Sequence, residues 1–248
     1  MNKILLLILL LLMIYVGGKR GVKLFFACCL NFFLLILIFY FITIGFNPII
    51  ITILGCLLFS LIILYFVNGE NIKTKTSLHS VCIILIVLLL LIIIISKNSL
   101  IAGFGSESFE EINMFSYDID IDFTNITISL ILIGLVGATI DSAISISSSL
   151  YEIYINNKKI SKQELFKSGL NIGKDILGTT VNTLFFAFLG EFLTLILWFK
   201  TDNYCFSEII NNKTFAKEII KIMFSIIGSI LVIPLTAYIT SYKLKKEK

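Results

Sequence analysis

Long apolar runs, separated by short polar segments, dominate this chain. A helix needs about 20 apolar residues to cross the hydrocarbon core of a bilayer. By this measure the pattern predicts seven membrane spans, at residues 3–16, 22–45, 47–67, 77–96, 124–153, 174–199 and 217–240. The first run is short. The prediction is therefore an all-α polytopic transmembrane helix bundle, with a six-span core plus a short N-terminal span, in a single membrane domain over residues 1–248.

The fifth predicted span gathers its small and polar residues on one side. With helical residues spaced about 100° apart, that side is an arc of roughly 120°. The arc holds Thr127, Gly134, Gly137, Ala138, Asp141, Ser145, Ser148, Ser149 and Glu152, and the opposite side holds Leu132, Ile133, Val136, Ile140 and Ile144. Because small residues let helices approach closely, the pattern predicts an apolar side toward lipid and a polar side toward another helix.

Asp141 lies well inside this span, among small residues. A charge at the centre of a bilayer costs at least about 2.5 kcal/mol and marks a functional site by default. In one interpretation the carboxylate binds a proton or another cation. In the other it is hydrogen-bonded to Thr179, Asn182 or Thr183 and holds two helices together.

The sixth predicted span has a polar face of its own, made of Asp175, Thr179, Asn182, Thr183, Phe186, Gly190 and Thr194. We expect the two faces to meet in a hydrated or hydrogen-bonded seam. The candidate residues of this seam are Asp141, Ser145, Ser148, Glu152, Asp175, Thr179, Asn182 and Thr183. For Glu152 and Asp175 two alternatives stay open: a cytoplasmic exit for the same ion, or ion pairs with Lys174 or Lys158.

Charge and composition set the expected class and orientation. The chain has 248 residues, of which 58% are hydrophobic and 15% charged, and its mean hydropathy is +1.01. Soluble domains carry about 25% charged residues. Basic residues gather at 19–23, in the connector at 154–173 and in the tail, and acidic residues gather at 97–123. Because basic loops stay cytoplasmic, we expect an external N-terminus and acidic loop, and a cytoplasmic C-terminus. The expected location is a bacterial plasma membrane.

Residues that usually carry enzyme chemistry are sparse. The single histidine, His79, makes no metal site or Ser-His pair by itself, and the five cysteines are expected to act as small hydrophobes. Asp118, Asp120 and Asp122 alternate in the acidic loop, but the glycine and glutamate of a calcium loop are missing. We therefore expect a solvated loop, no enzyme activity, no cofactor, no metal and no nucleic-acid partner.

The connector between the two polar spans contains a helix start. Ser161 is followed three residues later by Glu164, the pattern of a capping box. In the short helix that this predicts, Leu165, Phe166 and Leu170 would press into the membrane interface while lysines face lipid headgroups. A solvated basic loop is the alternative.

Two neighbouring stretches carry a family resemblance. The segments GATIDSAISISSSLYEI (137–153) and SKQELFKSGLNIGKDILGTTVNTLFFAFLGE (161–191) resemble the signature of YibE/F membrane proteins. The resemblance covers roughly residues 17–241, and the compact size is similar to that of the shorter, YibF-like members. It implies a multi-pass membrane protein, with a paralogous YibE-like protein or a second copy as its partner, and it brings no activity with it.

A weaker likeness concerns mechanism. Without the first segment, the span with Asp141 is the fourth of six, an order similar to that of RND permeases and SecD/SecF components, whose fourth span carries a coupling Asp. Their large external insert is missing here. The likeness implies an ion-coupled role. Two functions stay open: a transporter or permease subunit that uses Asp141, or a non-transporting scaffold subunit, which tolerates Asn at this position.

Overall fold

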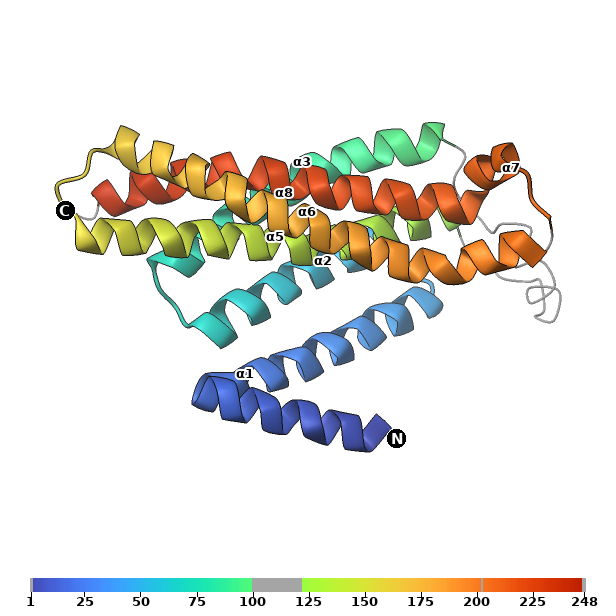
Figure 1. Cartoon of the computed structure of the whole chain (residues 1–248), viewed down its shortest axis with the longest axis horizontal. Coiled ribbons are helices and arrows are strands. Elements are labelled where there is room, and N and C mark those ends of the chain that lie inside the picture. The colour runs from blue at the N-terminus through green and yellow to red at the C-terminus, as the bar shows by residue number, and fades with distance from the viewer. Residues whose placement is uncertain (1, 100–121, 202, 247–248) are drawn as a thin grey trace.

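All regular structure in the described residues, 2–99, 122–201 and 203–246 of the computed structural model, is helical (Figure 1). This confirms the predicted all-α class. The helices are α1 (Asn2–Thr43), α2 (Pro48–Leu61) with a π-helical continuation (Ile62–Val67), α3 (Ile72–Asn98), α5 (Phe123–Asn156), α6 (Lys162–Thr201), α7 (Phe206–Asn211) and α8 (Lys213–Lys246). Within this described part, six helices are long and apolar enough to cross a membrane.

The first of these helices, α1, reverses direction at Gly18. This residue has φ 53° and ψ −133°, a conformation that glycine adopts without steric cost. Gly21 lies against the backbone of Met13, where a Cβ would overlap the Met13 carbonyl oxygen. Figure 1 shows the two arms of α1 as separate rods that meet at a sharp bend. The six helices therefore differ from the seven predicted spans at this junction between 3–16 and 22–45, and the orientation of the termini stays a prediction.

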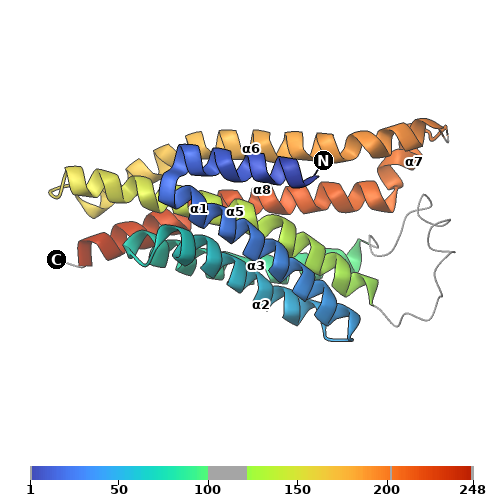
Figure 2. The same ribbon diagram turned by 90° about the horizontal axis from the view of Figure 1, so that it is seen from below.

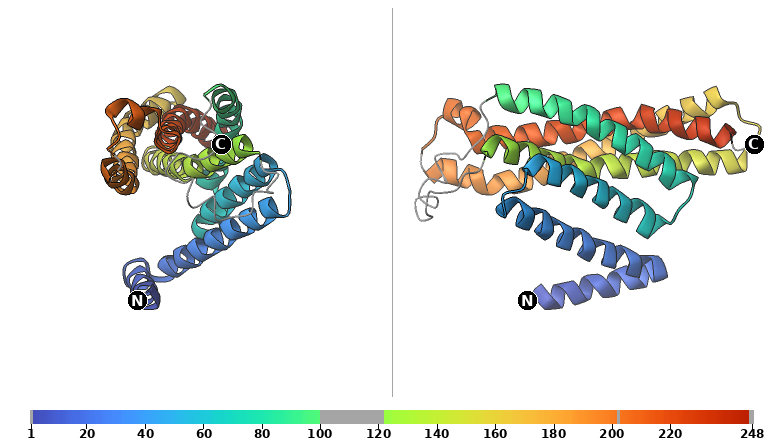
Figure 3. Two further views of the ribbon diagram at one scale, coloured as in Figure 1. Left: turned by 90° about the vertical axis from the view of Figure 1, so that its right-hand side faces the viewer. Right: turned by 180° about the vertical axis from the view of Figure 1, so that it is seen from behind.

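The core of the bundle forms around α5. This helix packs against α2, α3, α6 and α8, and its side chains Ile131 and Leu135 are fully buried. Gly228 of α8 permits a close approach, since a Cβ there would press on Thr139 and Leu88. The two views of Figure 3 show α8 alongside α5, with the first arm of α1 standing apart from the other helices.

Two helix starts are fixed by local sequence. Pro48 is the first residue of α2, and the Asn47 side chain accepts a hydrogen bond from the Ile49 N–H, an arrangement that suits a proline without an N–H of its own. α3 begins at Ile72 rather than at 77, because Asn71 forms a capping box with the third residue of the helix. The polar residues before 77 thus extend the span instead of forming a loop.

The predicted acidic loop at 97–123 falls almost wholly outside the described residues, and Asp118 and Asp120 are among those left out. Asp122 is described. Its carboxylate accepts hydrogen bonds from the N–H groups of Thr124 and Asn125 and so caps the first turn of α5. A negative side chain at this position also interacts favourably with the helix dipole.

The connector and the sixth predicted span form one helix of 40 residues, α6. The prediction of a separate short helix is therefore wrong, although its capping box is confirmed: the Ser161 N–H donates to Glu164 at 2.9 Å, and the Glu164 N–H donates to the Ser161 hydroxyl at 3.2 Å. The hydrogen bond from the Ser161 backbone lowers the pKa of Glu164. Leu165 is fully buried, so this turn packs on protein rather than on the membrane interface.

Candidate functional site

The polar stripe of α5 points the opposite way from the prediction. Leu132, Val136 and Ile140, which the pattern assigned to lipid, are at most 5% exposed and pack in the core. Asp141 and Glu152, which it assigned to a helix contact, are exposed. Gly134, Asp141 and Glu152 of the stripe therefore lie on the outer surface of this chain, whereas Thr127 is buried and the three serines are half-buried.

Asp141 lies near the middle of α5. No hydrogen bond or ion pair joins its carboxylate to any described residue. Ser145 and Ser148 follow on the same side and are half-buried. The Ser145 carbonyl accepts a hydrogen bond from the Ser149 hydroxyl at 2.9 Å, while the Ser148 hydroxyl has no bond within the described chain. Two helical turns, about 10 Å, separate Asp141 from Ser148.

The four candidate residues on α6 are exposed as well. The Thr179 and Thr183 hydroxyls donate to carbonyls of their own helix, at 2.9 Å each. Asp175 and Asn182 have no hydrogen bond or ion pair with any described residue. In this single chain, the polar faces of α5 and α6 do not bond to one another.

Two glycines fix how α6 meets α5. A Cβ on Gly169 would contact Leu150, and one on Gly173 would contact Ile146. Along antiparallel helices this register puts Asp141 at the depth of residue 178, within about one turn of the candidate residues on α6. The two helices separate beyond these contacts, as Figure 2 shows at the ends of α5 and α6 nearer α7. Asp141 and the candidate residues on α6 therefore lie at the same depth without touching one another.

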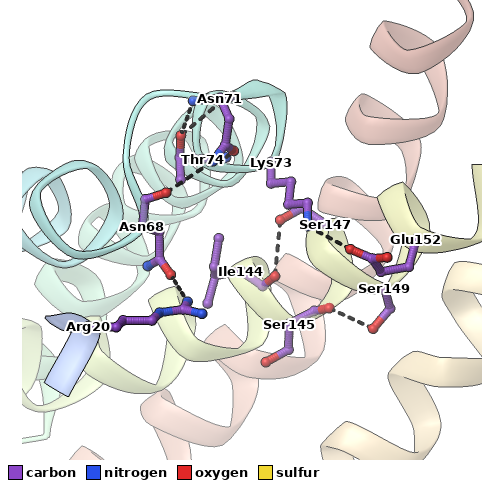
Figure 4. Close-up of polar contacts among 10 residues, drawn as sticks. All are labelled: Arg20, Asn68, Asn71, Lys73, Thr74, Ile144, Ser145, Ser147, Ser149 and Glu152. Atoms are coloured by element: carbon purple, nitrogen blue, oxygen red, sulfur yellow. Dashed lines mark hydrogen bonds and ion pairs between the residues drawn. The ribbon is translucent and has the colours of Figure 1, made fainter. Parts of the chain in front are cut away.

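Glu152, at the C-terminal end of the stripe, has a partner that the sequence did not suggest. Lys73, in the first turn of α3, places its Nζ 2.9 Å from Glu152 Oε1 (Figure 4) and 4.5 Å from the centre of the Tyr151 ring. The predicted partners, Lys174 and Lys158, are not used. The pairing links α3 to α5 across 79 positions of sequence.

A buried pair of hydroxyls supports the same contact. Ser77 and Ser147 are 2.6 Å apart, and the Ser77 hydroxyl also lies 3.2 Å from the Ala143 carbonyl oxygen. Both serines are fully buried. Interhelical hydrogen bonds of this kind contribute about 0.6–1.7 kcal/mol within a membrane. They position α3 and therefore the ammonium group of Lys73.

Next to Lys73 lies a polar cavity of ≈ 520 Å³, lined by Arg20, Val67, Asn68, Asn71, Lys73, Thr74, Ile144 and Ser148. Arg20 Nη2 donates to Asn68 Oδ1 at 2.5 Å (Figure 4). Sequence reasoning included Ser148 alone of this set among the site residues. In the sequence, Arg20 indicated only the expected membrane orientation, and no sequence pattern predicted that it would lie near α3.

A second cluster of charged side chains lies near the N-terminal end of α8. Lys221 pairs with Glu191 of α6 at 3.4 Å and with Glu218 on its own helix. The methylene groups of Lys221 cover Gly134 on the α5 stripe, where a Cβ would meet them. Glu191 therefore has an ion-pair partner on α8.

Candidate metal ligands do not cluster in the described residues: no group of three or more His, Cys, Asp or Glu side chains is placed to hold an ion there. The polar cavity is lined by cations and neutral side chains, which suits an anion better than a metal ion. The chemistry that the stripe offers is thus protonation or ion contact at Asp141.

Comparison with known proteins gives one match. The sequence model of the family described as YibE/F-like protein matches residues 5–246. No curated protein and no solved structure matches the chain. The match spans almost the full length of the six-helix membrane protein described above, including α5, α6 and the turn between them. The chain therefore belongs to the YibE/F-like protein family.

Proposed function

We propose that this multi-pass membrane protein is a subunit of an ion-coupled transporter in a bacterial plasma membrane, with Asp141 as the group that binds a proton or another cation. The observation that carries the proposal is the position of Asp141: midway along a membrane-length helix, exposed and without a bonded partner in the described residues. Ionisable groups at such depth face a protein interior or a water-filled path. The proposal assigns no catalytic group.

The remaining stripe supports a route toward the cytoplasm. Ser145 and Ser148 continue from Asp141 one turn at a time, and Ser148 lines the polar cavity. Beyond it, the carboxylate of Glu152 is held by Lys73. Hydroxyl groups at these positions accept and donate hydrogen bonds to water or to a hydrated ion.

The exposed face of α6 favours a second candidate function, that of a non-transporting subunit that assembles with another membrane protein. Asp175 and Asn182 are exposed and unbonded in the described chain, and lipid offers them no hydrogen bonds. A paralogous protein or a second copy would cover this face. Both candidates require assembly, and only the first requires ionisation at position 141.

The test compares the wild type with Asp141→Asn and Asp141→Ala in proteoliposomes, following internal pH and membrane potential while external pH and sodium are stepped. Glu191→Gln serves as the matched control, because it removes a carboxylate that pairs with Lys221 and lies off the stripe. Transport predicts that the wild type and Glu191→Gln dissipate an imposed gradient, whereas both Asp141 variants do not.

Gel filtration of each variant separates loss of function from loss of assembly. If Asp141→Asn assembles normally and moves ions at the wild-type rate, Asp141 is not a coupling group. A different result would favour the scaffold function over transport. In that case neither the wild type nor any variant moves ions, and Asp141→Asn assembles normally while Asp141→Ala does not.

A further inference from the structure

The cavity beside α3 has a chemistry of its own, independent of any transport. Its walls come from three separate parts of the chain: the bend of α1, the turn between the π-helical segment and α3 with the first residues of α3, and Ile144 and Ser148 of α5. Its volume of ≈ 520 Å³ falls within the range of about 300–1,000 Å³ that is usual for small-ligand sites. Among the lining residues, Arg20 and Lys73 are the charged ones, and both are cations.

Arg20 is held in place without being neutralised. One of its terminal nitrogens donates to Asn68 Oδ1 at 2.5 Å, and the Asn68 amide is itself fixed by donating to the Ile63 carbonyl at 3.0 Å. Within the described residues, no carboxylate lies within ion-pair distance of the guanidinium. The remaining N–H groups of the fork are available to a ligand.

The two nearby acidic side chains are each paired with a lysine, one of which lines the cavity. Glu152 binds Lys73 at 2.9 Å, and Glu70 binds Lys75 at 2.8 Å, which lowers the pKa of Glu70. Glu152 neutralises only one of the two cations that line the cavity, Arg20 and Lys73, so the cavity keeps a positive charge. The Ser148 hydroxyl faces it with no bond inside the described chain and adds a neutral donor.

Phosphate oxygens match this set of donors. A guanidinium fork binds phosphate through two parallel hydrogen bonds, and an ammonium and a hydroxyl complete the shell around a tetrahedral anion. The position also fits, because Arg20, Lys73 and the other basic residues near the bend of α1, Lys19 and Lys23, mark the cytoplasmic headgroup level by the charge rule.

From this geometry we infer that the cavity lined by Arg20, Lys73 and Ser148 binds a phosphate group. The group belongs either to an anionic phospholipid headgroup or to a free phosphate ion. Both sources use the same contacts. They differ in whether acyl chains along the exposed first arm of α1 contribute to binding.

The experiment measures ligand binding to the purified full chain in a non-ionic detergent, by native mass spectrometry and by thermal shift. The probes are inorganic phosphate, short-chain phosphatidylglycerol, and the matching diacylglycerol, which has the chains and no phosphate. Saturable binding of phosphatidylglycerol alone identifies a headgroup site, and saturable binding of phosphate identifies an ion site. Equal binding of diacylglycerol and phosphatidylglycerol would overturn the inference.

Variants locate the site. Arg20→Gln is expected to weaken binding by about tenfold or more, as loss of a charged hydrogen bond does. Lys19→Gln removes the same charge from the neighbouring position, which does not line the cavity, and should leave binding within about twofold. If both variants weaken binding equally, the ligand is held by general surface charge and the specific site is refuted.

A second variant covers the case in which Arg20→Gln does not fold. The double substitution Lys73→Gln with Glu152→Gln removes an ion pair without leaving an unpaired charge, and it is expected to weaken phosphate-group binding by about tenfold. Unchanged binding in this variant overturns the inference. Because binding is measured without transport, a failure here leaves the proposal for Asp141 untouched.

Discussion

α5 and α6 are two long helices with similar polar faces and very different surroundings. In its most apolar stretch, half of the residues of α5 are buried, against 6% in that of α6. Both helices direct their carboxylates, Asp141 and Asp175, away from the core. The difference lies in the other face: α2, α3, α6 and α8 all pack on α5, whereas α6 packs mainly on α8 and α5.

On α6, Asp175 and Asn182 are exposed and have no hydrogen-bond or ion-pair partner among the described residues. Apolar exposure by itself costs nothing in lipid, because lipid tails are as apolar as leucine. Exposed amide and carboxyl groups do carry a cost there. The presence of Asp175 and Asn182 on an uncovered helix thus supports an assembly rather than a lone bundle, in line with the proposed subunit function.

The largest expected effect is on the free energy of unfolding, and it compares a buried leucine of α5 with an exposed leucine of α6. Leu135→Ala on α5 removes a fully buried side chain and should destabilise the protein by about 2–5 kcal/mol. Leu193→Ala on α6 changes a side chain that is 60% exposed and should stay within about 0.5 kcal/mol. Thermal unfolding in detergent measures both. Equal destabilisation would mean that α6 is packed as tightly as α5.

The next effect concerns how tightly the start of α6 packs on its neighbours. Gly173→Ala puts a methyl group against Ile233 and should cost about 1–3 kcal/mol by overpacking. Gly178→Ala, five residues on, meets no atom within 4 Å and should stabilise the helix by about 0.5–1 kcal/mol. The same unfolding assay reads the sign of each change. A loss at both positions would show that α6 is tightly packed at Gly178 as well.

A smaller effect tests what covers the polar face of α6. Asn182→Leu should weaken association with the partner or second copy by roughly 3- to 15-fold, since an interhelical hydrogen bond contributes about 0.6–1.7 kcal/mol. Thr183→Val is the control, because the Thr183 hydroxyl already donates to the Thr179 carbonyl. Association is measured by energy transfer between labelled chains in vesicles. Unchanged association in Asn182→Leu would place the interface elsewhere.

The smallest effect concerns the start of α6. The pKa of Glu164 is lowered by hydrogen bonding from the Ser161 N–H, so the folded helix binds this proton less readily than the unfolded chain. The stabilisation is present above the ordinary pKa of glutamate and is lost as pH falls through the lowered folded value. An NMR titration of the Glu164 carboxyl carbon should show the low midpoint, and Ser161→Pro, which removes the N–H, should raise it. Identical midpoints would exclude this hydrogen bond.

Local sequence predicted several features that neighbouring residues decide, although it placed the start of α3 too late and expected a separate short helix before α6. The apolar runs gave the membrane-length helices, Gly18 falls where two of them separate, and the capping pattern at Ser161 and Glu164 appears in the structure as hydrogen bonds. The angular spacing of residues also placed Asp141, Ser145 and Ser148 on one side of α5. These properties depend on backbone geometry and on side chains within a few positions.

Only the tertiary structure decided which side of α5 is inside. The pattern separates an apolar face from a polar face, but a lipid environment and a protein core are both apolar, so Leu132 and Ile140 satisfy either. The packing of α3 and α8 resolved this by burying the apolar face. The same packing brought Lys73 to Glu152, and the bend of α1 brought Arg20 to the cavity. Such contacts join positions far apart in sequence, and no local pattern encodes them.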